Sequence, residues 1–446
     1  MAVQAFNIPF NSVNAVRPWV AFVTTAVRHR PTGIARMKGK PQSLSDVNKE
    51  IRSNTSTDYP VIEVMDLTKR KGDSILFDQV NPTYGLPTMG NAYISGKGEA
   101  PTFSQGSARL DMTRYSINAG AYMDRQRSPH DVESLVSNMI ATYLGNLQDE
   151  RLLVHAAGAR GFHQSDEWIL PLEANDPAAF ASIMINPVLA PANLRHYVAN
   201  SLTGLDKFTP VAGVANIATL DIMTPQVLDA LGQEFDLMPF APKPIKLEGD
   251  TQAEDSPIRG VIFMSPSQFK SFKDGTFPGG ISFRMLQAQS MARASAAKQN
   301  PVLMGEAALW NGFLILSMRK PIRFYANNAI NYCASQTSAI ESIATVNAIF
   351  GITHAIDRAI VLGANAIAHL IGKPVVYGTK ETGDLEGLAC MLATEITDMG
   401  NRIEVAGITA DGVAKIRHTR RTRAGTDVFV ENIVCIDTAV VLVGGV

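Results

Sequence analysis

Residues 128–158, SPHDVESLVSNMIATYLGNLQDERLLVHAAG, carry the strongest secondary-structure signal in the chain. Ser128 is a favourable N-cap, Pro129 suits the first helical position, and Gly158 and Gly161 are typical of a helix end. The apolar stripe at helical spacing comprises Val132, Leu135, Val136, Met139, Ile140, Tyr143, Leu144 and Leu147. At about 1.5 Å per residue this pattern predicts an amphipathic helix of roughly 40 Å. A helix of that length usually forms the central support of a domain.

The segment before this helix combines chain-breaking and apolar residues. Residues 77–103, FDQVNPTYGLPTMGNAYISGKGEAPTF, contain four glycines and three prolines. The aromatic residues of this stretch are Phe77, Tyr84, Tyr93 and Phe103. Alternating segments flank it at 73–77 and 108–123, and alternation predicts strands. We therefore expect residues 61–123 to form a long β-excursion with a tip rich in glycine and proline.

The rest of the chain mixes helix and strand signals. Residues 1–60 show little periodicity and predict an extended arm. A helix is expected to begin near Thr224-Pro225, and the apolar run 261–265 predicts a buried strand. The other predicted elements are a short helix at 266–275, a helix at 281–300, strands within 308–325 and two strands within 426–443.

The composition bounds the class of protein. It is 46% hydrophobic and only 18% charged, whereas typical soluble domains are about 25% charged. A large, well-buried enzyme or an oligomer with extensive interfaces would explain this shortage of charge. The net charge of −1 does not support attraction of the whole chain to nucleic acid or acidic lipid.

Local composition argues against a membrane protein and against a disulfide framework. Basic residues cluster at 28–40 and 420–423, but no aromatic residues interleave with them for base stacking. The three cysteines are far apart and form no C-x-x-C motif, so a reducing compartment fits best. The N-terminus lacks a signal-peptide pattern, and the apolar run 359–371 is too short to span a bilayer.

No catalytic or phosphate-binding motif is complete. Asn91 breaks a phosphate-loop pattern and Pro101 breaks a dinucleotide fingerprint, and no zinc-protease or nucleophile-elbow motif occurs. His155 and His163 flank a glycine-rich turn. The acidic residues near them are Asp166 and Glu167. A metal pocket is one interpretation, but a histidine at a helix end near a surface loop is favoured, because the spacing matches no common ligand pattern.

Other charged residues are interpreted as structural. Asp149 and Glu150 are adjacent on the predicted helix and diverge by about 100°, so they are not expected to share a substrate. Glu150 with Arg151 is interpreted as surface charge on that helix. His354 and Asp357, one helical turn apart, are attributed to a capped helix. We therefore predict no catalytic residue, no cofactor and no metal site, and a protein that is not an enzyme.

Several short motifs along the chain resemble those of a known protein family. In chain order they are Phe77-Asp78, Pro82-Thr83-Tyr84-Gly85, Gly98-Glu99, Arg125-Gln126-Arg127, Glu150-Arg151, Ala157-Gly158-Ala159-Arg160-Gly161, Asn300-Pro301, Gly305, Trp310, Gly312, Arg358 and Leu362-Gly363-Ala364-Asn365-Ala366. With the order of the predicted elements, they resemble the major capsid proteins of tailed bacteriophages, which have the Hong Kong 97-type fold. More narrowly, they resemble the capsid family of the N-four-like phages. The resemblance covers roughly residues 60–375.

The resemblance implies an α+β fold of that type and a division of the chain. The implied regions are an N-terminal arm at 1–60, an extended loop at 61–123, a peripheral domain with a spine helix at 124–205, an axial domain at 206–375, and C-terminal strands returning to the peripheral domain at 376–446. The extended loop would then lie across a neighbouring subunit, and the axial domain would gather around five-fold and six-fold axes.

The implied function is structural. Such a chain would self-assemble through pentamers and hexamers into the icosahedral shell around the genome of a tailed phage. It would be assembled in the host cytoplasm and reside in the virion. Implied partners are further copies of the chain, possible scaffold, portal, cement or decoration proteins, and enclosed double-stranded DNA bound without sequence specificity; no membrane is implied.

The composition of the segment at 77–103 suits docking on another copy. Its glycines permit positive φ and close approach of a second backbone, and its prolines limit the freedom lost on docking. The expected contact residues are Pro82, Tyr84, Gly85, Gly90, Tyr93, Gly98, Glu99 and Phe103. Lys97 lies where some members of the wider fold crosslink to a neighbour, although a solvated turn lysine is favoured.

Two other classes remain open at this point. One is a bacterial encapsulin-type compartment shell, which shares the fold and differs in particle content. The other is a cytosolic α/β enzyme in which the segment at 77–103 is an active-site lid.

Overall fold

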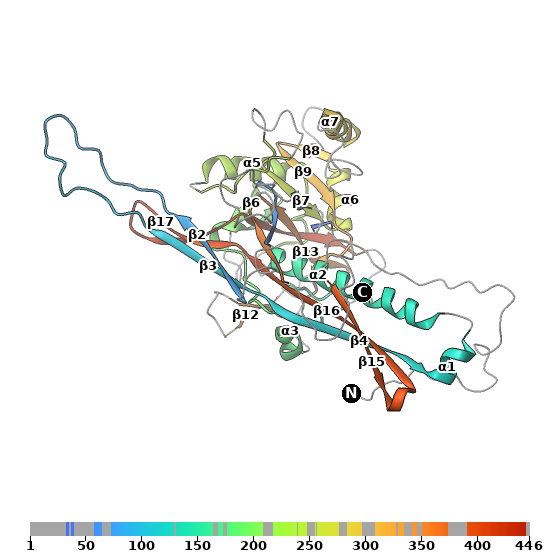
Figure 1. Ribbon diagram of the computed structural model, residues 1–446. Helices are drawn as coiled ribbons and strands as arrows, with labels where there is room; N and C mark the ends of the chain where they lie inside the picture. Colours follow the sequence, from blue (N-terminus) through green and yellow to red (C-terminus); the bar gives the residue numbers. More distant parts are fainter. Residues whose placement is uncertain are drawn as a thin grey trace.

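The computed structural model describes most of the chain. The described residues are 33–34, 37–39, 58–64, 73–128, 131–163, 168–172, 176–207, 217–238, 240–247, 255, 257–275, 283–296, 308–326, 329–333, 341–345, 350–372 and 390–442. Their strands form two large sheets and three two-stranded hairpins. Figure 1 shows the hairpin of β2 and β3 extending from one side of the molecule, while α1 and the end of the β15–β16 hairpin lie at the opposite side.

The larger sheet has eight strands in the order β6-β5-β19-β13-β7-β9-β8, with β10 also paired to β13. Its strands are β5 (His196–Asn200), β6 (Gly204–Lys207), β7 (Gly260–Met264), β8 (Ala308–Trp310), β9 (Phe313–Ser317), β10 (Ile322–Phe324), β13 (His354–Leu362) and β19 (Ile433–Val441). Residues along β7 and most of β13 are buried without alternation. Both faces of this sheet are therefore covered.

Helices supply the two covers of the larger sheet. On one face, α5 (Pro225–Leu237), α6 (Pro266–Asp274) and α7 (Phe283–Ala296) contribute apolar residues to a shared core with the strands. On the other face, the C-terminal half of α2 (Val132–Ala157) packs through residues such as Leu153 against β7 and β13. The sheet thus lies between a layer of short helices and the end of one long helix, as Figure 1 shows.

The predicted starts of two helices in this region, α5 and α6, are confirmed. α5 begins directly after Thr224 with Pro225 in its first turn. α6 follows β7, starts with a capping box formed by Ser265 and Gln268, and ends before Gly275. β8 and β9 are joined at Asn311-Gly312, where both residues have positive φ, as a tight hairpin turn requires.

The second sheet has five strands. They are β1 (Val61–Val64), β4 (Asp111–Ala121), β14 (Ile367–Ile371), β15 (Cys390–Thr397) and β16 (Arg402–Lys415). The long strand β16 is its centre, because β14, β15 and β4 all pair with it antiparallel. The N-terminal half of α2 packs on this sheet through Val136, Ile140 and Leu144. The long helix therefore contacts both sheets, which suits its predicted role as a central support.

The start of α2 differs from the prediction. Its N-cap is Asp131, whose carboxylate accepts from the backbone N–H of Ser134. Ser128 instead ends a separate short helix, α1 (Tyr122–Arg127), and is extended. A residue before proline is biased away from helical geometry, which suits the end of α1 at Ser128, and Asp131 is an equally good N-cap three residues later. The predicted end is confirmed: Gly158 is left-handed, with φ 72°.

Only part of the apolar stripe of α2 is buried in the core. Val136, Ile140, Leu144 and Leu147 are buried, but Met139 is 41% exposed. From Asp149 to its end, every residue of the helix is buried. The long helix is therefore amphipathic in its first half and enclosed on all sides in its second half.

The interpretation of the charges on α2 as surface charge is wrong. Glu150 is fully buried and pairs with Lys320 at 2.6 Å, and its carboxylate also accepts from the backbone N–H groups of Ile169 and Leu170. Arg151 pairs with Asp411 on β16 at 3.2 Å. Buried charges are tolerated only when they are paired in this way, and adjacent-residue spacing does not reveal the partners.

A second buried network joins α2 to the larger sheet. Arg358 on β13 makes a two-point contact with Asp437 on β19, at 2.7 and 2.8 Å. It also donates to the carbonyl of Ala157, the last residue of α2. His196 bonds the same Asp437 carboxylate at 2.7 Å. Cys435 is fully buried beside this network.

The attribution of His354 and Asp357 to a helix is also wrong. Both residues lie in β13, which pairs with β19 over its whole length. Asp357 is buried and accepts from Arg323 on β10 and from Ser265, the N-cap of α6. A spacing of three residues suits one helical turn, but pairing partners elsewhere in the chain decided the strand.

Other elements are small. They are the hairpin of β11 (Ala329–Cys333) and β12 (Glu341–Thr345), the hairpin of β17 (Arg417–Arg421) and β18 (Asp427–Glu431), the helix α3 (Pro177–Ile183), and the 3-10 helices η4 (Asn193–Arg195) and η8 (Asp398–Gly400). Most of the predicted N-terminal arm lies outside the described residues.

The predicted ranges do not follow the sheets. β1 and β4, from the range predicted for the extended loop, belong to the five-stranded sheet, and β2 and β3 between them pair with each other as a separate hairpin. β5 and β19 lie in the larger sheet, although their residues fall in the ranges predicted for the peripheral domain and the returning strands. The division into domains stays a prediction.

Candidate inter-subunit surface

The extended hairpin consists of β2 (Ser74–Val80), a tip at residues 81–102 and β3 (Phe103–Arg109). The strands pair antiparallel from Ser74↔Arg109 to Val80↔Phe103. The backbone N–H of Asn81 donates to the carbonyl of Thr102 and continues the pairing by one step. Exposure alternates along both strands. The hairpin therefore has one face toward the body and one toward solvent.

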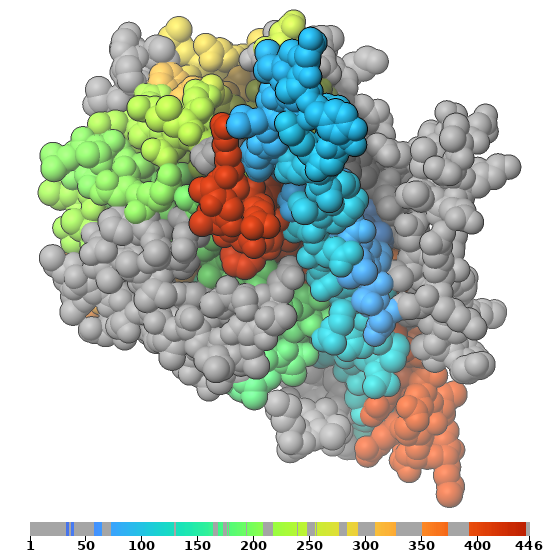
Figure 2. All heavy atoms as spheres, turned by 90° about the vertical axis from the view of Figure 1, so that its left-hand side faces the viewer, coloured from blue at the N-terminus to red at the C-terminus, as the bar shows by residue number. Residues whose placement is uncertain are grey.

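The inner face fastens the hairpin to the body. Ile75 and Phe77 pack against an apolar cluster formed by β1, β14 and the end of β16. On β3, Ser104 accepts a hydrogen bond from the backbone N–H of Thr419 on β17, at 2.7 Å. Figure 2 shows the hairpin running along one face of the molecule with the β17–β18 hairpin (red) beside it.

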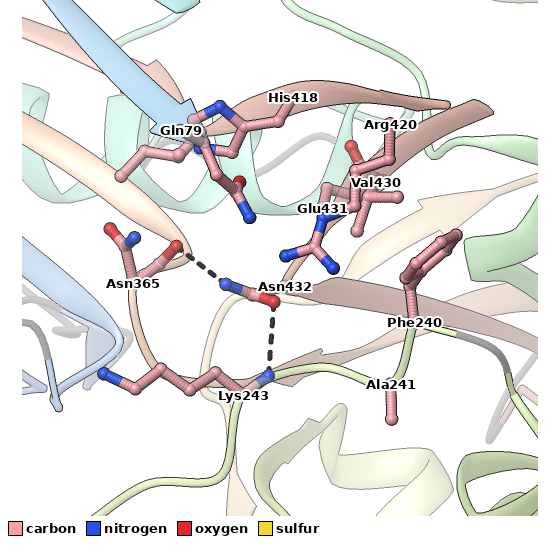
Figure 3. A pocket seen from close by; sticks show the side chains of 11 residues that line it. Gln79, Phe240, Ala241, Lys243, Asn365, His418, Arg420, Val430, Glu431 and Asn432 are labelled. Atoms are coloured by element: carbon pink, nitrogen blue, oxygen red, sulfur yellow. Dashed lines mark hydrogen bonds between the residues drawn. The ribbon is translucent and has the colours of Figure 1, made fainter. Parts of the chain in front are cut away.

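A polar hollow of about 220 Å³ lies at this junction. Gln79 enters it from β2, while Arg420 comes from β17, and Asn432 bridges the backbone of Lys243 and Asn365 (Figure 3). With its amide oxygen turned toward the guanidinium, Gln79 accepts from Arg420 Nε at 3.2 Å. The hairpin thus rests on side chains from several separate segments of the chain.

A histidine in this wall is held without charge. Burial and, to a smaller extent, the neighbouring Arg420 cation lower the pKa of His418. A neutral imidazole avoids a second positive charge beside Arg420, where the two would repel. At neutral pH, His418 therefore adds no charge repulsion at this junction.

The outer face and the tip expose a large apolar surface. Its residues are Leu76, Val80, Leu86, Met89, Tyr93, Ile94 and Phe103, each at least 59% exposed. Single exposed apolar side chains are ordinary, but a row of them on one projecting hairpin marks an interaction site. Of these seven, the sequence prediction named only Tyr93 and Phe103. The period-two pattern of β2 could have indicated Leu76 and Val80.

Most of the predicted contact residues are exposed. Tyr93 is 79% and Phe103 is 62% exposed. Pro82, Gly85, Gly90, Gly98 and Glu99 are exposed as well, and Tyr84 is half-buried. Lys97, the candidate for a crosslink, is exposed in the same tip. The tip therefore does not bury its aromatic side chains in its own subunit, as an aromatic lid closed over a pocket would.

The glycines of the tip have different roles. Gly90 and Gly96 have positive φ, at 60° and 82°, and supply the left-handed geometry that was predicted. Gly85 and Gly98 do not have positive φ. At Gly85 a Cβ would lie 2.9 Å from Glu99 Oε2, whereas at Gly98 it would meet nothing within 4 Å. The absence of a side chain at Gly85 serves a close contact inside the tip.

The two histidines considered for a metal pocket lie in different surroundings. His155 is 1% exposed, and burial, with Lys415 and Arg151 nearby, lowers its pKa to about 3. It lies in the last turn of α2, as the sequence suggested, but it is buried rather than at the surface. His163 contacts the hydroxyl of Tyr325 at 3.3 Å. Within the described part of the chain, no three His, Cys, Asp or Glu side chains gather to hold a metal ion; Asp166 and Glu167 lie outside it.

Comparison with known proteins identifies the family. A family model described as phage capsid protein matches residues 7–442. The chain belongs to the phage capsid protein family. The predicted resemblance is thereby confirmed, and the chain is a structural component of a phage virion. This family is not a class of enzymes. No curated protein matches the chain in sequence.

Solved structures of phage capsids share the fold. The capsid of Ralstonia phage GP4 is 21% identical, with 98% of each chain covered and a TM-score of 0.64. The cyanophage Pam1 capsid is 14% identical, with a TM-score of 0.53 over 94% of this chain and 99% of that one. The capsid of Helicobacter pylori bacteriophage KHP30 is 12% identical, with a TM-score of 0.53 over 98% and 99%. The predicted α+β capsid fold is confirmed by these matches.

One further finding concerns membranes. Among the helices that the structure describes, none is long and apolar enough to cross a bilayer.

Proposed function

We propose that this chain is the major capsid subunit of a tailed bacteriophage. Copies of it assemble through pentamers and hexamers into an icosahedral shell that encloses the double-stranded DNA genome. The capsid proteins of Ralstonia phage GP4 and cyanophage Pam1, which have the same fold, support this proposal. Assembly takes place in the host cytoplasm, with scaffold, portal and cement or decoration proteins as further partners.

One observation carries the proposal: the apolar outer face of the extended hairpin faces solvent in the isolated chain. Tyr93 and Phe103 belong to this surface. It lies on the hairpin that projects from the body, and the body holds the strands of this hairpin in place. A shell subunit has several neighbours, and each specific contact buries roughly 800 Å² per partner. Such burial also accounts for a composition with only 18% charged residues.

The regions of the chain have proposed roles in the shell. The extended hairpin lies across an adjacent subunit. The five-stranded sheet with α2 forms the peripheral domain, and the larger sheet with α5, α6 and α7 forms the axial domain around the five-fold and six-fold axes. The arm at residues 1–60 reaches a neighbouring subunit.

Particle formation tests the proposal. The chain is expressed alone, and particles are also isolated from phage-infected cells. Both preparations are examined by analytical sedimentation and negative-stain electron microscopy. We expect pentamers, hexamers or closed icosahedral particles, and DNA inside particles from infected cells. A chain that stays monomeric at high concentration in near-physiological salt would contradict the shell, and particles that hold a protein cargo instead of DNA would indicate an encapsulin-type compartment.

A further inference from the structure

The tip of the extended hairpin lies beyond the support of the body. The strand ladder ends at Val80↔Phe103, and one more backbone bond joins Asn81 to Thr102. From 82 to 100 the described residues form no strand pairing. A loop of this length loses much conformational freedom when it is ordered by a partner. Anything that orders it beforehand strengthens docking.

The Glu99 carboxylate bridges the two limbs of this tip. Its Oε2 accepts from the backbone N–H of Gly85 at 2.7 Å and from that of Tyr84 at 3.1 Å, while Oε1 lies 3.3 Å from the same Tyr84 nitrogen. Hydrogen bonds in which the acceptor is ionised are stronger than neutral ones. The bridge closes the segment from residue 84 to residue 99 into a loop.

Gly85 makes room for the bridge. A Cβ at this position would lie 2.9 Å from Glu99 Oε2, closer than a real side chain is found. Its φ is outside the left-handed region, so the backbone itself would accept alanine. The glycine therefore serves the approach of the carboxylate rather than a turn.

We propose that Glu99 is a positioning residue that holds the tip in its docking conformation before a neighbouring copy arrives. Gly85 is the matching half of this device. The pair fixes the direction in which the limb carrying Tyr84 leaves the hairpin, relative to the limb that returns to Phe103. This inference rests on the proposed assembly function, which it deepens. The bridge itself belongs to the single chain and is measurable without assembly.

Amide hydrogen exchange of the unassembled full-length chain tests the bridge directly. Glu99→Ala and Gly85→Ala are both expected to speed exchange at the Tyr84 and Gly85 amides by about tenfold, because each loses a charge-assisted hydrogen bond. Gly98→Ala is the matched control, since its Cβ would meet nothing within 4 Å. It should leave exchange at these amides unchanged. Unchanged exchange in Glu99→Ala would overturn the proposal.

Assembly rates, followed by light scattering, test the purpose of the bridge. Both variants should assemble about tenfold more slowly, and the double variant should be no slower than either single one, because both act through one contact. Fully additive effects, or wild-type rates, would overturn the positioning role. Glu99→Gln, which keeps one acceptor oxygen without charge, should be intermediate, and thermal unfolding should match wild type throughout. If the wild-type chain itself formed no particles, the proposed function would fail while the exchange result still stood.

Discussion

The sharpest test of the shell reasoning contrasts two phenylalanines on opposite faces of one hairpin. Phe103 points outward and is 62% exposed, whereas Phe77 packs against the apolar cluster of β1, β14 and β16. A buried aromatic side chain removes roughly 150–250 Å² from water. Covering the exposed part of Phe103 would bury about 120 Å², and about 25 cal/mol per Å² makes this up to about 3 kcal/mol per contact. Phe103→Ser should thus weaken each contact by roughly a hundredfold.

Two measurements separate the faces. Sedimentation over a concentration series gives the concentration at which oligomers form, and urea unfolding of the unassembled chain gives its stability. Phe103→Ser should raise the assembly concentration by about two orders of magnitude and leave the unfolding midpoint unchanged. Phe77→Ser should instead lower the free energy of unfolding by about 2 kcal/mol, because it removes packing inside the subunit.

The opposite pattern would refute the reasoning. If Phe103→Ser destabilised the isolated subunit and assembled normally, the outer face would belong to the subunit's own core. If both variants had the same effect in both assays, the distinction between the two faces would have no energetic basis.

Three other expectations concern the body of the subunit. Leu144→Asp should unfold it, with a loss above about 5 kcal/mol, whereas Met139→Asp on the exposed side of α2 should change the urea midpoint little. Gly161→Ala should lower the free energy of unfolding by about 2 to 4 kcal/mol. The reason is that φ is 79° and the new Cβ would lie 2.9 Å from the Arg323 backbone. Gly351→Ala, with φ 52° and open space around its Cβ, should lower it less in the same urea unfolding measurement. Burial lowers the pKa of His155 to about 3, so the folded state resists its protonation. Stability is full above the ordinary pKa of about 6.5 and falls as pH drops toward 3, by about 2 to 3 kcal/mol between pH 6.5 and 4.5; His155→Gln should remove this dependence in urea titrations, and an unchanged slope would contradict it.

Local features of the chain were predictable from sequence because they depend on neighbouring residues. The end of α2 at Gly158, the start of α5 at Pro225 and the hairpin turn at Asn311-Gly312 follow from the geometry that these residues favour. The family resemblance was carried by short motifs in order, and the match over residues 7–442 confirms it. The composition of residues 77–103, rich in glycine, proline and aromatic residues, likewise indicated a projecting segment.

Partners far apart in the chain were decided only by the tertiary structure. Glu150 is buried because Lys320, on a distant segment, neutralises it, and Arg358 lies in a strand because β19 and β10 flank it. The outward direction of Leu76 and the bridge from Glu99 to Gly85 depend on which strand face the body covers and how the tip folds. Sequence by itself determined several helix ends, the class of fold and the segment at 77–103 that combines glycine, proline and aromatic residues. Long-range pairing decided which charges are buried and which apolar residues stay exposed, since burial depends on neighbours that the linear order does not specify.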